Sequence, residues 1–276
     1  MQGQGIKTNA FLPDINIETY HAGPGISKSQ LDQVAKSPAH WKASLEIERK
    51  ETPALRVGRL FHNVVLEPES IDLAVAPKVD RRTKVGKATW EAFVSANKDS
   101  QVVTEDEYTL IMGMRDSVML HPIAKALFEL DGMFEHSVYW QNEESGLLCK
   151  CRPDWWLPGK QVIVDLKTTE DARPWAFARD SAKYRYHVQN AFYDEGVGSV
   201  ALSQGFIFVV VEKAPPYAVA VYQLDDQAIL AGQIMYQEEL NILADCQRTG
   251  IYPAYSDRIE VLSLPKYTIQ EAFDHV

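Results

Sequence analysis

The chain has 276 residues, of which 46% are hydrophobic and 24% are charged, a composition typical of an ordinary globular protein. Its 28 basic and 38 acidic residues give a net charge of −10, which argues against a protein that coats nucleic acid over its whole surface. The same charge leaves room for an enzyme whose basic residues line one channel.

Cysteine content and apolar runs bear on where the protein works. The three cysteines cannot all pair within one chain and are too few to staple a secreted fold, so we expect a reducing, cytoplasmic environment. The first residues lack the basic start and apolar core of a signal peptide. No run approaches the roughly 20 apolar residues that span a bilayer. The sequence therefore predicts neither export nor a membrane partner.

The first half of the chain has helical signals. Residues 1–25, with two prolines and four glycines, predict a poorly packed N-terminal arm, and residues 26–276 predict a single domain without internal repeats. The capping-box pattern Ser27-Lys-Ser-Gln30 predicts the start of a helix. A second helix is expected over residues 54–66. One or two more are expected over residues 104–130, with a break near His121-Pro122.

The middle of the chain changes to strand-like spacing. Three apolar runs, at residues 134–141, 147–156 and 161–168, are separated by turn-forming residues and predict an antiparallel meander. We then expect a helix over 176–195, strands over 205–212 and 217–224, and a long helix over 225–248. This order predicts an α+β fold with a mixed central sheet flanked by helices.

The segment Arg152-Pro-Asp154, followed by Asp165-Leu-Lys167, is the most informative part of the sequence. Side chains two apart on a strand share a face, so Asp165 and Lys167 point the same way. If residues 157–160 close a hairpin, Asp154 lies close to Asp165. Two close carboxylates repel unless a cation or proton lies between them, and such oxygen ligands suit Mg²⁺ or Mn²⁺. For the Asp-x-Lys triplet alone, a solvated ion pair is the alternative.

These residues resemble the signature of the PD-(D/E)XK nuclease superfamily. From about residue 26 to residue 265 the chain looks most like the RecE-type exonucleases, the exodeoxyribonuclease VIII group, and their phage relatives. Gly58-Arg-Leu-Phe-His62 is similar to the upstream Gly-x-x-x-His helix of the RecB-like and RecE-like branches. Gln189 and Tyr193 match the Gln-x-x-x-Tyr helix that follows the hairpin, and residues 80–87 resemble the basic loop that approaches DNA.

The resemblance implies a Mg²⁺-dependent enzyme, in which Mn²⁺ substitutes, with four side chains at its site. Asp154, Asp165 and the backbone carbonyl of Leu166 would hold the metal. His62 would complete the metal shell or position one of its ligands. Lys167 would orient or deprotonate the attacking water, with its pKa lowered by the neighbouring cation.

Positive charge is concentrated in one stretch. Residues 78–87 carry five basic side chains against one acidic side chain, a local charge of +4. Such a run is usually a solvated loop, but beside a nuclease motif we expect it to follow DNA phosphates. The complete set of expected DNA-binding residues is Arg81, Arg82, Lys84, Lys87, Arg185, Gln189 and Tyr193.

The resemblance implies an exonuclease that digests linear double-stranded DNA from its ends, 5′ to 3′, in phage-type homologous recombination within a bacterial host cytoplasm. It also implies a ring-shaped homo-oligomer and a RecT-type single-strand annealing protein as partner. Two alternatives stay open: a structure-selective or sequence-selective DNA endonuclease, and a catalytically idle DNA-binding module of the same fold. The joint presence of His62, Asp154, Asp165 and Lys167 weighs against idleness.

Overall fold

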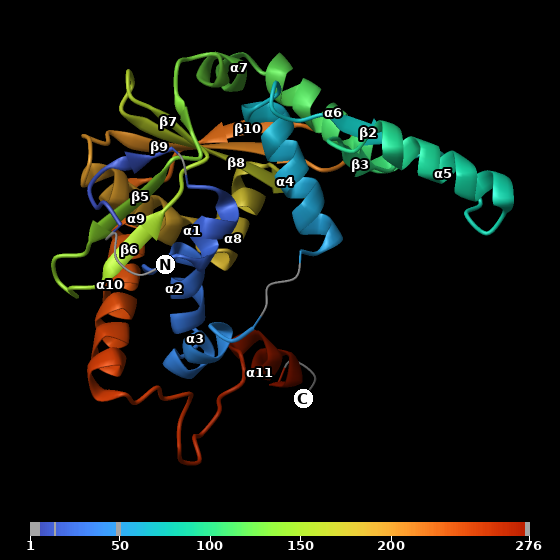
Figure 1. Cartoon of the computed structure of the whole chain (residues 1–276). Helices are drawn as coiled ribbons and strands as arrows, with labels where there is room; N and C mark the ends of the chain where they lie inside the picture. The colour runs from blue at the N-terminus through green and yellow to red at the C-terminus, as the bar shows by residue number, and fades with distance from the viewer. Residues whose placement is uncertain (1–5, 14, 48–50, 274–276) are drawn as a thin grey trace.

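The computed structural model describes residues 6–13, 15–47 and 51–273. Its central sheet has five strands in the order β10 (Val219–Tyr222), β9 (Gly205–Glu212), β8 (Val162–Thr169), β7 (Trp155–Leu157) and β4 (Met133–Phe134). Strands β8 and β9 run parallel, whereas the other neighbours run antiparallel. The mixed central sheet flanked by helices confirms the expected α+β fold (Figure 1).

Two smaller sheets complete the strands. One has the order β1 (Phe11–Leu12), β5 (Ser137–Gln141) and β6 (Leu148–Cys151), and the other pairs β2 (Leu73–Val75) with β3 (Gln101–Val103) in parallel. The helices are α1 (Ile17–Ala22), α2 (Lys28–Val34), α3 (Pro38–Ser44), α4 (Pro53–Leu66), α5 (Lys84–Ala96), α6 (Glu105–Leu120), α7 (Pro122–Phe128), α8 (Pro174–Lys183), α9 (Tyr186–Gly198), α10 (Asp226–Thr249) and α11 (Lys266–Phe273).

Strands β8 and β9 are covered on both faces, which explains their nearly continuous apolar sequences. On one face, Val164 and Leu166 of β8 pack in a cluster with buried residues of α4 and α6. On the other face, Ile163 joins Phe206 and Phe208 of β9, and this cluster includes residues of α8 and α9. The candidate site residues of β8 therefore lie inside a three-layer core.

Helices with clear capping signals are confirmed. The backbone N–H of Ser27 donates to Oε1 of Gln30 at 3.3 Å at the start of α2, as the capping-box pattern predicts. The break between α6 and α7 falls at His121, whose carbonyl and Nδ1 accept the first backbone N–H groups of α7. Helix α10 ends at Gly250, whose φ of 75° is readily adopted by glycine.

The single meander predicted over residues 134–168 is wrong in one respect. The hairpins β5–β6 and β7–β8 form, but they belong to different sheets. The first two apolar runs are each interrupted, one at Glu135 with a φ of 43° and the other before Asp154, where Pro153 lacks an N–H to donate. The chain therefore leaves one sheet and enters the other at these points.

The single helix predicted over residues 176–195 is also wrong, because Arg185 separates α8 from α9. Its φ is 58° and its ψ is 45°, a left-handed conformation that an uninterrupted helix cannot contain. The ion pairs of its side chain, described below, hold this conformation in place.

The described part of the N-terminal segment, residues 6–13 and 15–25, packs against the domain, unlike the poorly packed arm that its composition suggests. Strand β1 pairs with β5, and Tyr20 of α1 is buried. Nη1 of Arg152 donates to the carbonyl of Ile15 at 2.6 Å, and Nζ of Lys150 donates to the carbonyl of Gly23 at 2.6 Å. Strand pairing and long basic side chains thus compensate for the sparse apolar content of this segment.

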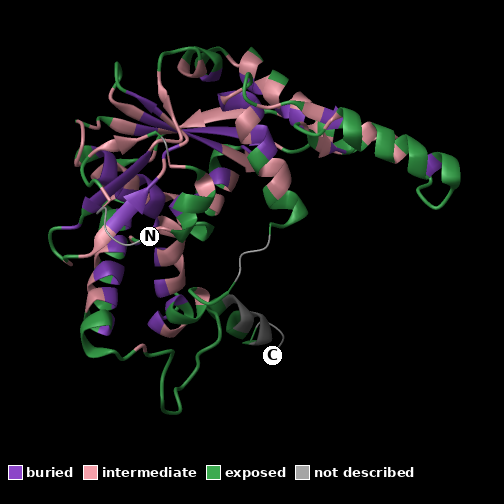
Figure 2. Cartoon of the chain, in the orientation of Figure 1, coloured by how far each residue is buried: buried purple, intermediate pink, exposed green. Residues whose placement is uncertain are grey.

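Helix α5 extends away from the sheets, with the basic loop directly before it (Figure 1). It is exposed along most of its length (Figure 2), and Gly86 is its one buried residue among those described. A Cβ at Gly86 would lie 2.0 Å from the backbone oxygen of Asp80, so the loop folds back onto the helix at a point where only glycine fits. The basic residues are therefore carried on a projecting arm.

Across the three described ranges, no helix combines the length and apolar character needed to cross a membrane.

Candidate active site

The β7–β8 hairpin brings Asp154 and Asp165 together. Trp155 pairs with Val164, and the same register extended by one residue sets Asp154 opposite Asp165. Oδ2 of Asp154 accepts a hydrogen bond of 2.9 Å from the backbone N–H of Leu166. The N–H and C=O of one strand residue point to the same side, so the carbonyl of Leu166 also faces the side of Asp154.

Asp165 is held between two polar side chains. Its own side chain is 1% exposed, which makes it the most deeply buried carboxylate of the site. Nε2 of Gln189 on α9 donates to Oδ1, and Nζ of Lys167 forms an ion pair with Oδ2. The expectation that Asp165 and Lys167 share a face of the strand is confirmed by this contact.

His62 approaches the carboxylates from α4. Its Nδ1 lies 3.5 Å from Oδ2 of Asp154, and its side chain remains 25% exposed. The structure therefore brings His62, which lies far away in the sequence, to Asp154, Asp165 and Lys167. In this arrangement His62 contacts Asp154, in agreement with a residue that positions a ligand.

Burial and neighbouring charges shift the pKa values of two groups in the site. Burial, and then the neighbouring charge of Asp165, raise the pKa of Asp154 above its usual range. Burial lowers the pKa of Lys167, but the charges of Asp165 and Asp154 outweigh burial and raise the pKa overall. The lowered pKa expected for Lys167 is therefore not a property of the protein groups alone, since only an added cation could oppose these carboxylates.

The donor set fits a hard divalent cation. Two adjacent carboxylates, of which Asp154 has a raised pKa, and a backbone carbonyl on the same side are the oxygen ligands that suit Mg²⁺ or Mn²⁺. Within the described residues, no three His, Cys, Asp or Glu side chains converge closely enough to form a metal site by themselves. The carboxylate pair with the Leu166 carbonyl is thus the candidate metal site, and His62 contacts it through Asp154.

Gln189 and Tyr193, expected to touch DNA, both point into the protein. Gln189 is 8% exposed, and its side-chain amide donates a hydrogen bond to Asp165. The ring of Tyr193 lies 6.3 Å from that of Phe206, and burial raises the pKa of its hydroxyl well above the usual range. The structure places the Gln189 amide against Asp165, and a DNA contact by Gln189 stays a prediction. A DNA contact by Tyr193 stays a prediction.

Arg185 is also placed differently from the expectation. Its guanidinium forms an ion pair with Glu239 of α10 and lies 3.7 Å from Asp32 of α2, and its side chain is 13% exposed. Asp32 and Glu239 thus already pair with the guanidinium charge that a DNA phosphate would contact. Arg185 thus joins α2, α9 and α10, and its contact with DNA stays a prediction.

The basic loop residues are exposed, as expected. Arg82 pairs with Asp80 at 3.1 Å, and the guanidinium of Arg81 lies 4.5 Å from the ring centre of Trp90. Lys84 and Lys87 lie exposed in the first turn of α5. None of these side chains reaches the carboxylates, and their contact with DNA stays a prediction.

Sequence reasoning missed Tyr186 as part of the site. Nζ of Lys167 lies 4.9 Å from the centre of its ring, and the ring stacks on Phe208 of the central sheet. Helical spacing offered a signal, because Tyr186 lies three residues before Gln189 and therefore shares its face of α9.

Comparisons with known proteins agree with this geometry. A family model described as a PDDEXK-like domain of unknown function (DUF3799) matches residues 27–265. The solved structure of a "Putative exonuclease" from Eubacterium rectale has a TM-score of 0.62 at 14% identity, covering 94% of this chain and 98% of that chain. A phage related exonuclease from Haemophilus somnus 129PT has a TM-score of 0.34 at 11% identity, covering 63% of this chain and 91% of that chain, a score too low to indicate a shared fold. The curated proteins contain no significant match.

Proposed function

This chain belongs to the PDDEXK-like domain family, within the PD-(D/E)XK nuclease superfamily, and on that premise we propose a Mg²⁺-dependent deoxyribonuclease that digests linear double-stranded DNA from an end. The observation that carries the proposal is the placement of Asp154, Asp165 and Lys167 across one hairpin. Mutual repulsion and burial of two carboxylates are costly for stability. A site that binds a cation and a phosphate accounts for that cost.

Asp154, Asp165 and the Leu166 carbonyl would hold Mg²⁺, with Mn²⁺ able to substitute. When bound, such an ion lowers the pKa of a coordinated water and neutralises charge on the phosphate. The ammonium group of Lys167 lies beside Asp165, where it can orient the attacking water and offset phosphate charge. His62 and Gln189 keep the two carboxylates in position.

The substrate is assigned from charge and resemblance. The exposed loop before α5 and the first turn of α5 offer Arg81, Arg82, Lys84 and Lys87 to DNA phosphates. The neighbour from Eubacterium rectale is described as a "Putative exonuclease", which supports action at an end. The RecE-type resemblance supports 5′ to 3′ polarity, phage-type recombination, a ring-shaped homo-oligomer and a RecT-type annealing protein as partner.

The test uses linear and covalently closed circular duplex DNA with Mg²⁺ or with chelator. The linear DNA is labelled at either its 5′ or its 3′ ends. We expect early release of the 5′ label as mononucleotides, intact circles, and no product with chelator. Cleavage of closed circles would assign an endonuclease instead. Absence of any Mg²⁺-dependent product would leave the catalytically idle DNA-binding module as the better account.

A further inference from the structure

A second feature adjoins the candidate active site. A cavity of about 530 Å³ opens between the end of β8 and helix α8. Thr168 and Thr169, which line it, directly follow Lys167 in the sequence. The size is typical of cavities that bind small ligands. The cavity is therefore within reach of a strand whose phosphate lies at the carboxylates.

Aromatic rings line the cavity and lead to the site. Trp175 is 55% exposed and Tyr184 is 48% exposed, although large aromatic side chains are usually more buried. A basic side chain lies over each ring, Arg173 over Trp175 at 4.9 Å and Lys183 over Tyr184 at 4.9 Å, so a base that stacks there would displace or share a face with that cation. The ring of Tyr184 stacks on that of Tyr186 with centres 5.8 Å apart, and Tyr186 in turn lies under Nζ of Lys167. A row of rings thus runs from Lys167 to an exposed ring in the cavity.

Two basic side chains of the lining keep their charge available. Lys213 pairs with Glu170, and Asp171 pairs with Arg173 at 2.6 Å. Arg179 and Lys183 have no carboxylate partner among the described residues. The remaining carboxylate, Asp180, accepts a hydrogen bond of 2.8 Å from the hydroxyl of Thr169. The free charge of the cavity is therefore positive.

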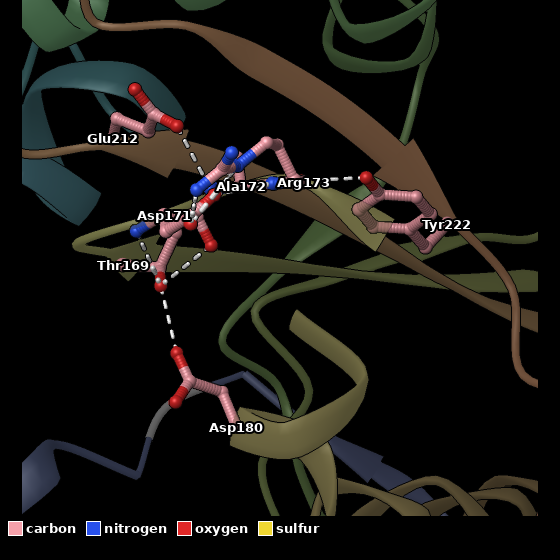
Figure 3. Close-up of polar contacts among 7 residues, drawn as sticks. All are labelled: Thr169, Asp171, Ala172, Arg173, Asp180, Glu212 and Tyr222. Carbon is pink, nitrogen blue, oxygen red and sulfur yellow. Dashed lines mark hydrogen bonds and ion pairs between the residues drawn. The ribbon is translucent and has the colours of Figure 1, made fainter. Parts of the chain in front are cut away.

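The wall of the cavity is fixed by hydrogen bonds. The hydroxyl of Thr169 lies between the backbone carbonyl of Asp171 and the carboxylate of Asp180 (Figure 3). Oε1 of Glu212 accepts a hydrogen bond of 2.9 Å from the backbone N–H of Ala172 (Figure 3). The hydroxyl of Tyr222 donates to the carbonyl of Ala172 at 2.6 Å (Figure 3). These bonds hold the loop before α8, so Trp175 is presented at the rim without the cost of ordering a loop on binding.

We propose that this cavity binds unpaired nucleotides beside the scissile phosphate, with bases stacked on Trp175 and Tyr184 and phosphates against Arg179 and Lys183. Bases within a duplex already stack on one another, so exposed protein rings are accessible to a base only where the strand is single. This inference rests on the proposed nuclease function and adds that the enzyme holds a melted strand at its site.

Affinity for a short fluorescent oligothymidylate, measured by anisotropy in chelator, tests the proposal without cleavage. Base stacking on aromatic rings is a main source of single-strand affinity, so replacing Trp175→Leu and Tyr184→Leu together should weaken binding by at least about tenfold. The ring-retaining pair Trp175→Phe and Tyr184→Phe should keep most of the affinity. Tyr255→Ala, which removes a tyrosine 77% exposed outside the cavity lining, should leave it unchanged. Blunt duplex affinity should change less than single-strand affinity.

Equal single-strand affinity of the leucine double variant and the parent protein would overturn the inference. Because binding is measured without catalysis, this failure is separate from failure of the nuclease proposal. Normal DNA cleavage by a protein whose single-strand affinity does not depend on Trp175 and Tyr184 would contradict only the inference about the cavity. A protein that binds single strands through Trp175 and Tyr184 but never cleaves DNA sinks only the proposed activity.

Discussion

The backbone N–H of Leu166 donates a 2.9 Å hydrogen bond to Oδ2 of Asp154, so a side chain takes the place of a backbone partner where β7 begins. This bond fixes the first carboxylate against the strand that carries the second. Asp165 and Lys167 flank Leu166 and point away from the layer in which Leu166 is buried. The spacing of the Asp-Leu-Lys triplet therefore combines a backbone anchor with two polar side chains on one face.

Gln189 should act through Asp165 and not through DNA. Its amide donates to a buried carboxylate, and loss of such a supporting bond typically weakens metal affinity 10- to 100-fold. For Gln189→Ala we expect the Mg²⁺ concentration for half-maximal cleavage to rise by about that factor, with the rate at saturating Mg²⁺ largely restored. Gln233→Ala, on the exposed face of α10, is the control. An unchanged Mg²⁺ titration would refute this role.

The basic loop should act through charge alone. Each phosphate contact contributes about one unit to the slope of log affinity against log salt concentration, so Arg81→Ala with Arg82→Ala should reduce the slope by about two. Binding should weaken similarly for unrelated DNA sequences. The matched control, Arg248→Ala with Arg258→Ala, removes two exposed arginines elsewhere, with side chains 72% and 81% exposed. Equal slopes for the two double variants would contradict a DNA-contacting arm.

Arg185 should matter for stability. Its side chain and that of Glu239 are 13% and 10% exposed, and removing one partner of a buried pair costs about 3–5 kcal/mol. We expect Arg185→Ala to lower the free energy of unfolding in urea by several kcal/mol. The exposed Arg179→Ala should change it by less than about 0.5 kcal/mol. An Arg185→Ala protein of parental stability with weakened DNA binding would instead support a DNA contact by Arg185.

Asp194 should give stability a dependence on pH. Burial raises its pKa above the ordinary value of 3.8, against an opposing hydrogen bond from Ser203. The folded state then binds this proton more tightly than the unfolded state. The contribution of Asp194 to stability is therefore fully present below pH 3.8 and is lost as pH rises through the raised pKa. Asp194→Asn, which can still accept the Ser203 bond, should reduce that loss, whereas the exposed Asp226→Asn should not. Unfolding curves at several pH values that keep the parental slope for Asp194→Asn would contradict this account.

Local signals predicted much of the fold. The capping box at Ser27, the break at His121 and the stop at Gly250 act through bonds within a few residues, so they are legible in the sequence. The left-handed conformation of Arg185 depends on carboxylates of α2 and α10, which no local pattern announces. The division of the strands into two sheets likewise depends on long-range pairing that Glu135 and Pro153 permit but do not specify.

The site was predictable to a similar extent. Strand periodicity and the hairpin turn were enough to bring Asp154, Asp165 and Lys167 together. The direction of the Gln189 amide was not predictable, because a position on a helix does not say which neighbour across the core it meets. The cavity beside Lys167 was beyond sequence reasoning for the same reason, since its walls come from β8, α8 and the segment after β9.

The most direct test of the central claim compares the parent protein with Asp165→Asn on linear duplex DNA in Mg²⁺. Retention of folding is checked by urea unfolding, and Asp131→Asn, at an exposed position, is the control. Because Asp165 is proposed to hold the metal beside Lys167, we expect its variant to cleave at least about 100-fold more slowly, with the control unaffected. Cleavage by folded Asp165→Asn at the parental rate would contradict a metal-dependent nuclease centred on this hairpin.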